Sequence, residues 1–121
     1  MPVRKILIVD DSPTNRAALS DMLARHGYQC TLAGSAKEAI EKAKAEKPDM
    51  ILMDVVMPEM DGYQATRIIT RDETTKNIPV ILCTSKNQET DKIWGVRQGA
   101  KDYVFKPVDE KDLLAKITSL R

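Results

Sequence analysis

Four short apolar segments of the chain are each followed by residues whose side chains could take part in chemistry. Two adjacent carboxylates, Asp10 and Asp11, follow the first segment, and Asp54, Thr84 and Lys106 follow the others. Clustered carboxylates hold hard divalent cations such as Mg²⁺, which prefer oxygen ligands. With a lysine and a hydroxyl to bind phosphoryl oxygens, a carboxylate nucleophile can accept a phosphoryl group. If these residues meet in space, phosphoryl transfer to an aspartate is the chemistry that they permit.

Asp54 is the residue that we expect to be the nucleophile. It follows the apolar run 50–53, which lies between Pro48 and Pro58 and is typical of a strand buried on both faces. A carboxylate at the end of such a strand is poorly solvated. Each pair of carboxylates at ~4 Å and an effective dielectric of ~20 costs about 4 kcal/mol. Three such pairs would approach the whole stability of a small domain, roughly 5–15 kcal/mol, so we expect Mg²⁺ and Lys106 to offset the repulsion.

The elements that must position these residues alternate along the chain. Short apolar and β-branched runs predict strands at 5–9, 29–33, 50–53, 78–83 and 102–105. Helical spacing of apolar residues predicts helices at about 13–26, 36–47, 62–70, 89–98 and 109–120. Capping residues support two of the helix starts, because Ser12 precedes Pro13, and Ser35 with Glu38 makes a capping box.

This alternation is typical of an α/β fold with a parallel sheet and helices on both of its faces. Right-handed crossovers favour a flavodoxin-like, doubly wound (βα)5 arrangement with strand order 2-1-3-4-5. In that order the first, third, fourth and fifth strands are neighbours. Their carboxyl ends carry Asp10, Asp11, Asp54, Thr84 and Lys106. The fold therefore predicts a single crevice that contains all of these residues.

The composition is that of an ordinary globular domain. The 121 residues are 42% hydrophobic and 31% charged, with a net charge of +1, which predicts one domain over 1–121. The near-neutral balance argues against nucleic acid or an anionic membrane as a partner. No apolar run approaches the ~18 residues of a membrane span, and no signal peptide precedes the first strand. Cys30 and Cys83 lie in apolar segments as expected for buried thiols, so we expect a cytoplasmic protein.

Each candidate residue also has a simpler interpretation. Asp11 could cap the first helix, and Asp10 could be a turn residue at the end of a strand. Lys106 could be a solvated lysine and Thr84 an ordinary residue at a strand end. An isolated Asp-Asp pair is a weak signal. The functional interpretation depends on the combination, with one such residue or pair at each of four neighbouring strand ends.

Four motifs resemble the receiver domain of two-component response regulators. They are Ile-Leu-Ile-Val-Asp-Asp-Ser, Leu-Met-Asp-Val-Val-Met-Pro-Glu-Met-Asp-Gly, Pro-Val-Ile-Leu-Cys-Thr-Ser and Gly-Ala-Lys-Asp-Tyr-Val-Phe-Lys-Pro. Each stands at the expected distance from the others, and the resemblance extends over 4–120. It implies a signalling protein that is not an enzyme, except that it catalyses its own phosphoryl transfer and autodephosphorylation.

The resemblance implies that a CheA-like histidine kinase phosphorylates Asp54. It also implies a Mg²⁺ ion held by Asp11, Asp54 and the backbone carbonyl of Val56. Asp10 would reach the metal through a water molecule.

The remaining site residues have roles that the resemblance also implies. Thr84 and Lys106 would contact the phosphoryl group, and Tyr103 matches the aromatic residue that switches conformation. The Lys106–Pro107 peptide bond would be cis, which the sequence alone does not favour, because only about 5–6% of bonds before proline are cis.

More narrowly, the chain is similar to stand-alone receivers of the PilH-like group, in chemosensory systems that control type IV pili and twitching. This similarity rests on the segment 87–103 and on Lys-Pro-Val-Asp-Glu. Two positions beside the phosphoryl group, Val56 and Lys86, vary across the family. Val56 cannot hydrogen-bond an attacking water, and Lys86 could pair with the phosphoryl charge. We therefore expect a longer-lived phosphoaspartate than in receivers with polar or acidic residues at these two positions.

The sequence up to Arg121 encodes no DNA-binding or enzymatic domain, so output is expected to pass through a protein partner if the chain is complete. The expected surface comprises the fourth helix, the fifth strand and the fifth helix, with Trp94 and Tyr103 exposed to the partner. Ile93, Val96 and Ala100 would form the buried stripe of the fourth helix. We expect the protein to be a monomer.

Other functions share some of these features. An aspartyl-phosphate phosphohydrolase would usually place a second acid at the position of Val56, and it would need a cap domain. A flavin-binding electron carrier would need a phosphate-binding loop where Asp10-Asp11 would repel the phosphate. Two alternatives remain within the receiver family: a phosphate sink for another receiver, and a binding module that acts without phosphorylation.

Overall fold

The computed structural model describes residues 3–84 and 96–120, and its framework is a parallel sheet. The strands are β1 (Lys5–Val9), β2 (Gln29–Ala33), β3 (Met50–Asp54), β4 (Val80–Thr84) and β5 (Asp102–Phe105). Their order in the sheet is β2-β1-β3-β4-β5, which confirms the predicted flavodoxin-like topology. All neighbouring pairs run parallel.

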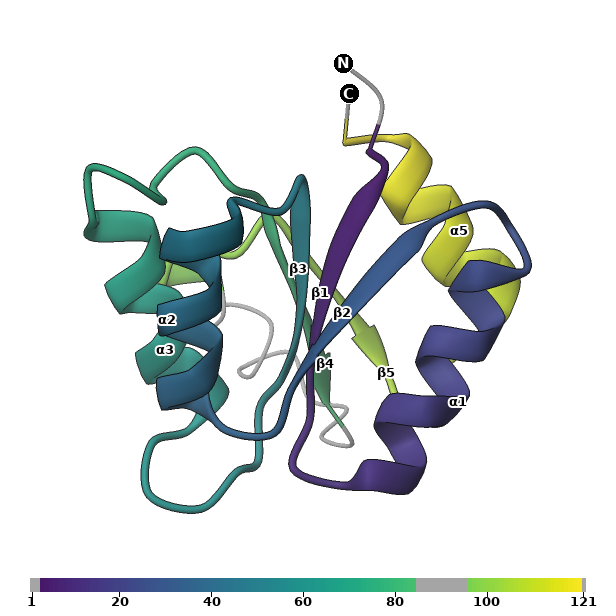
Figure 1. Ribbon diagram of the computed structural model, residues 1–121, viewed down its shortest axis with the longest axis horizontal. Helices are drawn as coiled ribbons and strands as arrows, with labels where there is room; N and C mark the ends of the chain where they lie inside the picture. Colours follow the sequence, from purple (N-terminus) through teal and green to yellow (C-terminus); the bar gives the residue numbers. More distant parts are fainter. Residues whose placement is uncertain (1–2, 85–95, 121) are drawn as a thin grey trace.

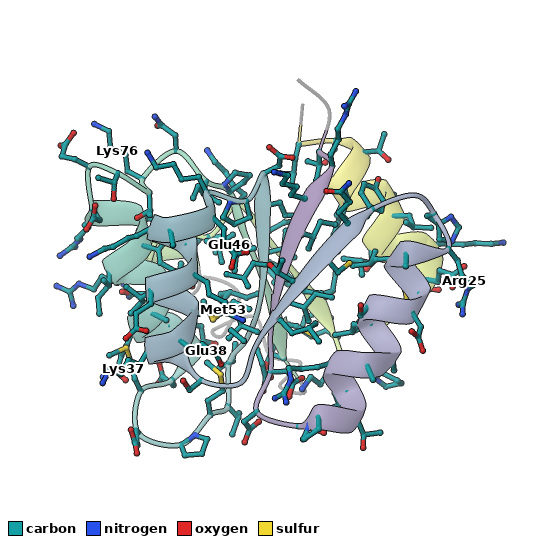
Figure 2. The ribbon with its side chains drawn as sticks, viewed as in Figure 1. Arg25, Lys37, Glu38, Glu46, Met53 and Lys76 are labelled. Atoms are coloured by element: carbon teal, nitrogen blue, oxygen red, sulfur yellow. The ribbon has the colours of Figure 1, made fainter. Side chains whose placement is uncertain are left out.

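Helices cover both faces of this sheet (Figure 1). They are α1 (Pro13–Ala24) and α5 (Glu110–Thr118) on one face, and α2 (Ala36–Glu46) and α3 (Gly62–Arg71) on the other. Alternate residues of β1 therefore enter two apolar clusters. Leu7 and Val9 pack with the α2–α3 layer, whereas Ile6 and Ile8 pack with the α1–α5 layer. Met53 of β3 belongs to the α2–α3 cluster and lies between the sheet and α2 (Figure 2).

The strand register brings the carboxyl ends of β1, β3, β4 and β5 to one edge of the sheet. Val9 is aligned with Met53 across β1 and β3, and Thr84 with Phe105 across β4 and β5. The loops that follow β1 and β3 are both at the lower end of Figure 1. This edge is where doubly wound sheets bind their ligands.

Three strand boundaries differ from the sequence prediction. β3 includes Asp54 itself, and β4 runs over Val80–Thr84 rather than over 78–83. Pro79 precedes the regular part of β4, and its carbonyl accepts a hydrogen bond from the Ile51 N–H at 2.9 Å. Because proline has no N–H group, regular pairing can start only after it.

The start of α2 differs in detail from the predicted capping box. The Ser35 hydroxyl accepts a hydrogen bond from the Glu38 N–H at 3.2 Å, as expected. The Glu38 carboxylate, however, accepts from the N–H of Gly34 at 2.7 Å rather than from that of Ser35. Glu38 therefore fastens the loop between β2 and α2 to the helix that follows.

The predicted fourth helix lies mostly outside the described residues, and so do Ile93 and Trp94. Residues 96 and 97 are helical. The expectation that Val96 is buried is wrong, since it is 56% exposed. Gly99 has a φ of 103° and turns the chain towards β5, so the helical spacing does not continue to Ala100. Ala100 is buried as expected, but it belongs to the segment that leads into β5 and not to the helix.

Neither cysteine forms a disulfide. Cys83 is buried as expected, whereas Cys30 is only half-buried because β2 is an edge strand. Within residues 3–84 and 96–120, no helix has both the length and the apolar character needed to cross a membrane.

Candidate functional site

Three carboxylates meet at the carboxyl edge of the sheet. One oxygen from each of Asp10, Asp11 and Asp54 lies within 4.8 Å of the others. Asp10 is 2% and Asp54 4% exposed, whereas Asp11 is open to solvent. Residues that are 44 positions apart in the sequence, such as Asp10 and Asp54, are brought together because β1 and β3 are paired.

Lys106 lies across this cluster and contacts two of its members. Its Nζ is 2.9 Å from Oδ1 of Asp54 and 3.2 Å from Oδ2 of Asp10. The Lys106–Pro107 peptide bond is cis, as the resemblance implied. The backbone N–H of Lys106 also donates to the carbonyl of Thr84 at 2.8 Å, which holds the end of β5 against β4.

Burial and neighbouring charges shift the pKa values of Asp54 and Lys106. Burial raises the pKa of Asp54; the hydrogen bond from Lys106 opposes this rise, and the charges of Asp10 and Asp11 add to it. Burial alone would lower the pKa of Lys106, but the hydrogen bonds and charges of Asp54 and Asp10 outweigh it and raise that pKa. The lysine therefore stays protonated at neutral pH.

Cys83 lies beneath the cluster, paired with Asp54 across β3 and β4. Burial raises the pKa of its thiol to about 12; the charge of Lys106 opposes the rise, and those of Asp54 and Asp10 reinforce it. The thiol is therefore neutral at physiological pH. It adds apolar packing but no further negative charge below the carboxylates.

Ser12 forms hydrogen bonds with the Asp10 carboxylate and with the first turn of α1. Its N–H donates to Oδ1 of Asp10 at 2.9 Å, and its hydroxyl accepts from the N–H of Asn15 at 3.3 Å as the cap of α1. The N–H of Asp10 donates to the carbonyl of Ala33 at 3.1 Å. The simpler interpretation of Asp11 as the cap of α1 is therefore not needed, because Ser12 fills that position.

Gly62, predicted only as the start of a helix, makes a close approach to the backbone of Asp54. A Cβ atom on Gly62 would lie 2.1 Å from the carbonyl oxygen of Asp54 and 2.9 Å from its carbonyl carbon. The Gly62 N–H also donates to the carbonyl of Val55 at 2.8 Å. The start of α3 therefore packs directly against the backbone of the candidate nucleophile. The glycine after Asp61 was a signal that could have indicated this approach.

The other predicted site residues that the structure describes are Thr84, Val56 and Tyr103, and they differ in how far they are buried. Thr84 is buried at the end of β4, and Val56, two residues after the end of β3 at Asp54, is 58% exposed. Tyr103 is half-buried on β5; its ring centroid is 5.5 Å from that of Phe105, and the Nζ of Lys116 lies 5.7 Å from the Tyr103 centroid. Lys86, like Trp94, falls outside the described residues.

A cavity of about 240 Å³ opens beside the carboxylate cluster, and its lining is mainly apolar. It lies between α1 and the segment that follows β5, and its lining residues are Asp10, Asn15, Ala18, Leu19, Met22, Lys106, Pro107 and Val108. An apolar surface thus adjoins two of the charged groups of the site.

The donor set fits a magnesium ion. Opposite ligands of an octahedral Mg²⁺ ion stand about 4.2 Å apart at the usual ~2.1 Å metal–oxygen distance. The three carboxylate oxygens lie within 4.8 Å of one another, so small side-chain shifts would complete the set. The oxygens belong to acidic groups only, with no thiolate or imidazole among them, which favours a hard cation over zinc.

Comparison with known proteins gives a consistent result. Residues 6–118 match the response regulator receiver domain family. The chain is 53% identical over 116 residues to Protein PilH of Pseudomonas aeruginosa, covering 96% of each chain. It superimposes on chemotaxis protein CheY4 of Vibrio cholerae with a TM-score of 0.91 at 29% identity, covering 98% of this chain and 99% of that one.

A further structure is the CheX–CheY–BeF3–Mg complex from Borrelia burgdorferi. It matches with a TM-score of 0.89 at 29% identity, covering 97% of this chain and 88% of that one. The family match spans almost all of the described residues, and the fold and the strand order agree with it. The chain belongs to the response regulator receiver family.

Proposed function

We propose that the chain is the receiver of a two-component phosphorelay, in which Asp54 accepts a phosphoryl group from a CheA-like histidine kinase in a Mg²⁺-dependent reaction. The observation that carries the proposal is the position of Asp54, buried among two further carboxylates and 2.9 Å from a protonated lysine. The test is the mass of the intact protein after treatment with Mg²⁺ and acetyl phosphate. A single added phosphoryl group that is absent in Asp54→Asn supports the proposal.

Each residue has a defined part in the proposed transfer. A carboxylate oxygen of Asp54 forms the new bond to phosphorus while the bond from phosphorus to the donor breaks, and the donor leaves with the electron pair. When bound, Mg²⁺ would supply the positive charge that the phosphoryl oxygens need. Lys106 would move its hydrogen bond from the Asp54 carboxylate to a phosphoryl oxygen, and Thr84 would donate its hydroxyl to another. Asp10, Asp11, Asp54 and the Val56 carbonyl would hold the metal.

The surface beside the site is suited to a protein donor. The apolar cavity between α1 and the Pro107 segment adjoins Asp10 and Lys106, and a phosphohistidine on another protein could approach Asp54 from this side. The Borrelia burgdorferi relative was crystallised with CheX, BeF3 and Mg. That composition supports a metal-dependent site and a protein partner for the present chain.

The similarity to PilH supports a role in pilus or other chemosensory motility control, because it spans 96% of both chains. Two modes of action fit that role. The phosphorylated receiver could bind an effector, or it could drain phosphoryl groups from another receiver. Tyr103 favours the first mode, since it lies on β5 and its ring is close to Lys116 of α5.

Tyr103 connects the proposed site to the proposed partner surface. Thr84 and Phe105 are aligned across β4 and β5, and the Phe105 ring contacts the Tyr103 ring. Lys116 of α5 lies over the Tyr103 ring and is held by Asp112 at 3.1 Å. A shift of Thr84 towards a phosphoryl group would change the packing of these rings and so favour a second arrangement of the surface.

Val56→Asn is expected to shorten the lifetime of the phosphoaspartate several-fold, because an amide can hold the attacking water and the valine side chain cannot. The measurement is the decay of phosphoprotein after the donor is removed. Val96→Asn is the matched control, since Val96 is equally exposed but lies away from Asp54. Equal decay rates for Val56→Asn and the wild type would contradict this role of Val56.

A further inference from the structure

Arg16, in the first turns of α1, reaches back to the end of β1. Its Nη1 donates a hydrogen bond to the backbone carbonyl of Asp10 at 2.7 Å, and the residue is half-buried. Hydrogen bonds from a charged donor are shorter and roughly twice as strong as those between neutral groups. The guanidinium therefore holds the peptide group that joins Asp10 to Asp11.

The other polar groups of Asp10 are held by different parts of the fold. Its N–H is bound to the carbonyl of Ala33, and its carboxylate is bound by the N–H of Ser12 and by Lys106. The strand pairing of β1 ends one residue earlier, at Val9. Arg16 thus supplies the restraint on the Asp10 carbonyl at the point where the sheet no longer does so.

The loop between β2 and α2 is shaped around this guanidinium. A Cβ atom on Gly34 would lie 3.0 Å from Nη1 of Arg16, so the absence of a side chain there leaves room for the arginine. The hydrogen bond from the Gly34 N–H, with additional help from Lys42 and Arg16, lowers the pKa of Glu38. Glu38, at the start of α2 in Figure 2, therefore keeps a negative charge near the guanidinium.

We propose that Arg16 is a positioning residue for the Mg²⁺ site, which acts by fixing the Asp10–Asp11 peptide group. Asp11 is exposed, and its carboxylate is joined to the backbone through a single Cβ, so the position of the backbone limits where the carboxylate oxygens can lie. The Arg16 hydrogen bond sets that backbone and holds the Asp11 oxygen near those of Asp10 and Asp54. The inference rests on the proposed function, since it concerns the metal that the proposed transfer requires.

The test is the affinity for Mg²⁺, measured by isothermal titration calorimetry without any phosphoryl donor. Arg16→Ala is expected to weaken binding about tenfold, the effect typical of residues that orient metal ligands. Arg16→Lys keeps a charged donor and is expected to recover part of the affinity. Arg25→Ala is the matched control at the C-terminal cap of the same helix, because Arg25 is exposed and its side chain pairs only with Glu110 among the described residues; its affinity should equal that of the wild type.

Urea unfolding without Mg²⁺ separates positioning from general stability. If Arg16→Ala does not fold, Arg16→Lys and Gly34→Ala, which crowds Nη1, provide the test, and both are expected to bind Mg²⁺ more weakly than the wild type. Unchanged affinity in the folded Arg16 variants overturns the inference. Equal weakening of Mg²⁺ binding by Arg16→Lys and Arg16→Ala also overturns it. A wild-type protein that does not bind Mg²⁺ overturns the proposed function itself, whereas wild-type binding with unaltered Arg16→Ala binding overturns only the role of Arg16.

Discussion

Gly62→Ala is expected to destabilise the domain by about 3 kcal/mol, the upper end of the usual effect of overpacking. The new Cβ atom would lie 2.1 Å from the Asp54 carbonyl oxygen and 2.9 Å from the Cα of Val55. Both are backbone atoms of a central strand and its continuation, so neither can move without disturbing the sheet. The free energy of unfolding in urea measures the effect.

Gly27→Ala is the matched control for this substitution. Gly27 follows α1 with a φ of +89°, and no atom would lie within 4 Å of its Cβ. The alanine would therefore cause only the strain of a left-handed backbone, about 1 kcal/mol. The close approach at Gly62 would be contradicted if the two variants lost the same stability.

Any Gly62→Ala protein that folds should also accept phosphoryl groups more slowly, because the backbone of Asp54 must shift.

Lys106→Ala is expected to lower the free energy of unfolding by about 3 kcal/mol when Mg²⁺ is absent, as is usual when one partner of a buried ion pair is removed. The lysine contacts Asp54 at 2.9 Å and Asp10 at 3.2 Å, and both carboxylates are buried. Without it, the carboxylates repel with no compensating charge. Mg²⁺ should restore much of the lost stability, because it binds only the folded arrangement.

The pH dependence provides a second check on Lys106. The pKa of Asp54 is raised in the folded protein, so its ionised form destabilises the fold, and this penalty disappears as pH falls and the carboxyl group becomes protonated. The destabilisation of Lys106→Ala should therefore shrink on acidification. Lys101→Ala, at an exposed site, should change little. A Lys106→Ala protein as stable as the wild type at pH 7 in the absence of Mg²⁺ would contradict the compensating role.

The strand order and the convergence of the site residues could be predicted from the sequence for a clear physical reason. Apolar runs such as that of β3 have no polar face, so they must be buried on both sides. Right-handed crossovers then leave few possible orders. Once the order is known, the residue after each strand must lie at the shared edge, and this placed Asp10 near Asp54.

Features that depend on distances between backbones could not be predicted in this way. The need for glycine at Gly62 arises because α3 starts against the Asp54 carbonyl; the glycine itself is a signal of some close approach, but it does not indicate which backbone atom comes near. Arg16 bonds a carbonyl six residues earlier, a contact that depends on the angle between α1 and β1. Glu38 accepts a hydrogen bond from the N–H of Gly34 rather than from that of Ser35, and this too depends on the local backbone geometry.

Helical spacing also failed where a helix ended. Val96 was expected to be buried on the same stripe as Ala100, but Gly99 turns the chain between them. A helical wheel assumes one continuous helix. It does not apply across Gly99, which has a left-handed backbone, because the residues before and after it no longer belong to the same helix. Position-by-position burial near Gly99 therefore required the structure.

The central claim is that Asp54 accepts the phosphoryl group, and the most direct test is the intact mass of wild-type and Asp54→Asn proteins after incubation with acetyl phosphate and Mg²⁺. Asp49→Asn serves as the matched control, because Asp49 is an exposed aspartate just before β3. We predict one phosphoryl adduct on the wild type and on Asp49→Asn, its loss when Mg²⁺ is removed with EDTA, and none on Asp54→Asn. An adduct on Asp54→Asn equal to that of the wild type, or no adduct on any of the three proteins, would contradict the account.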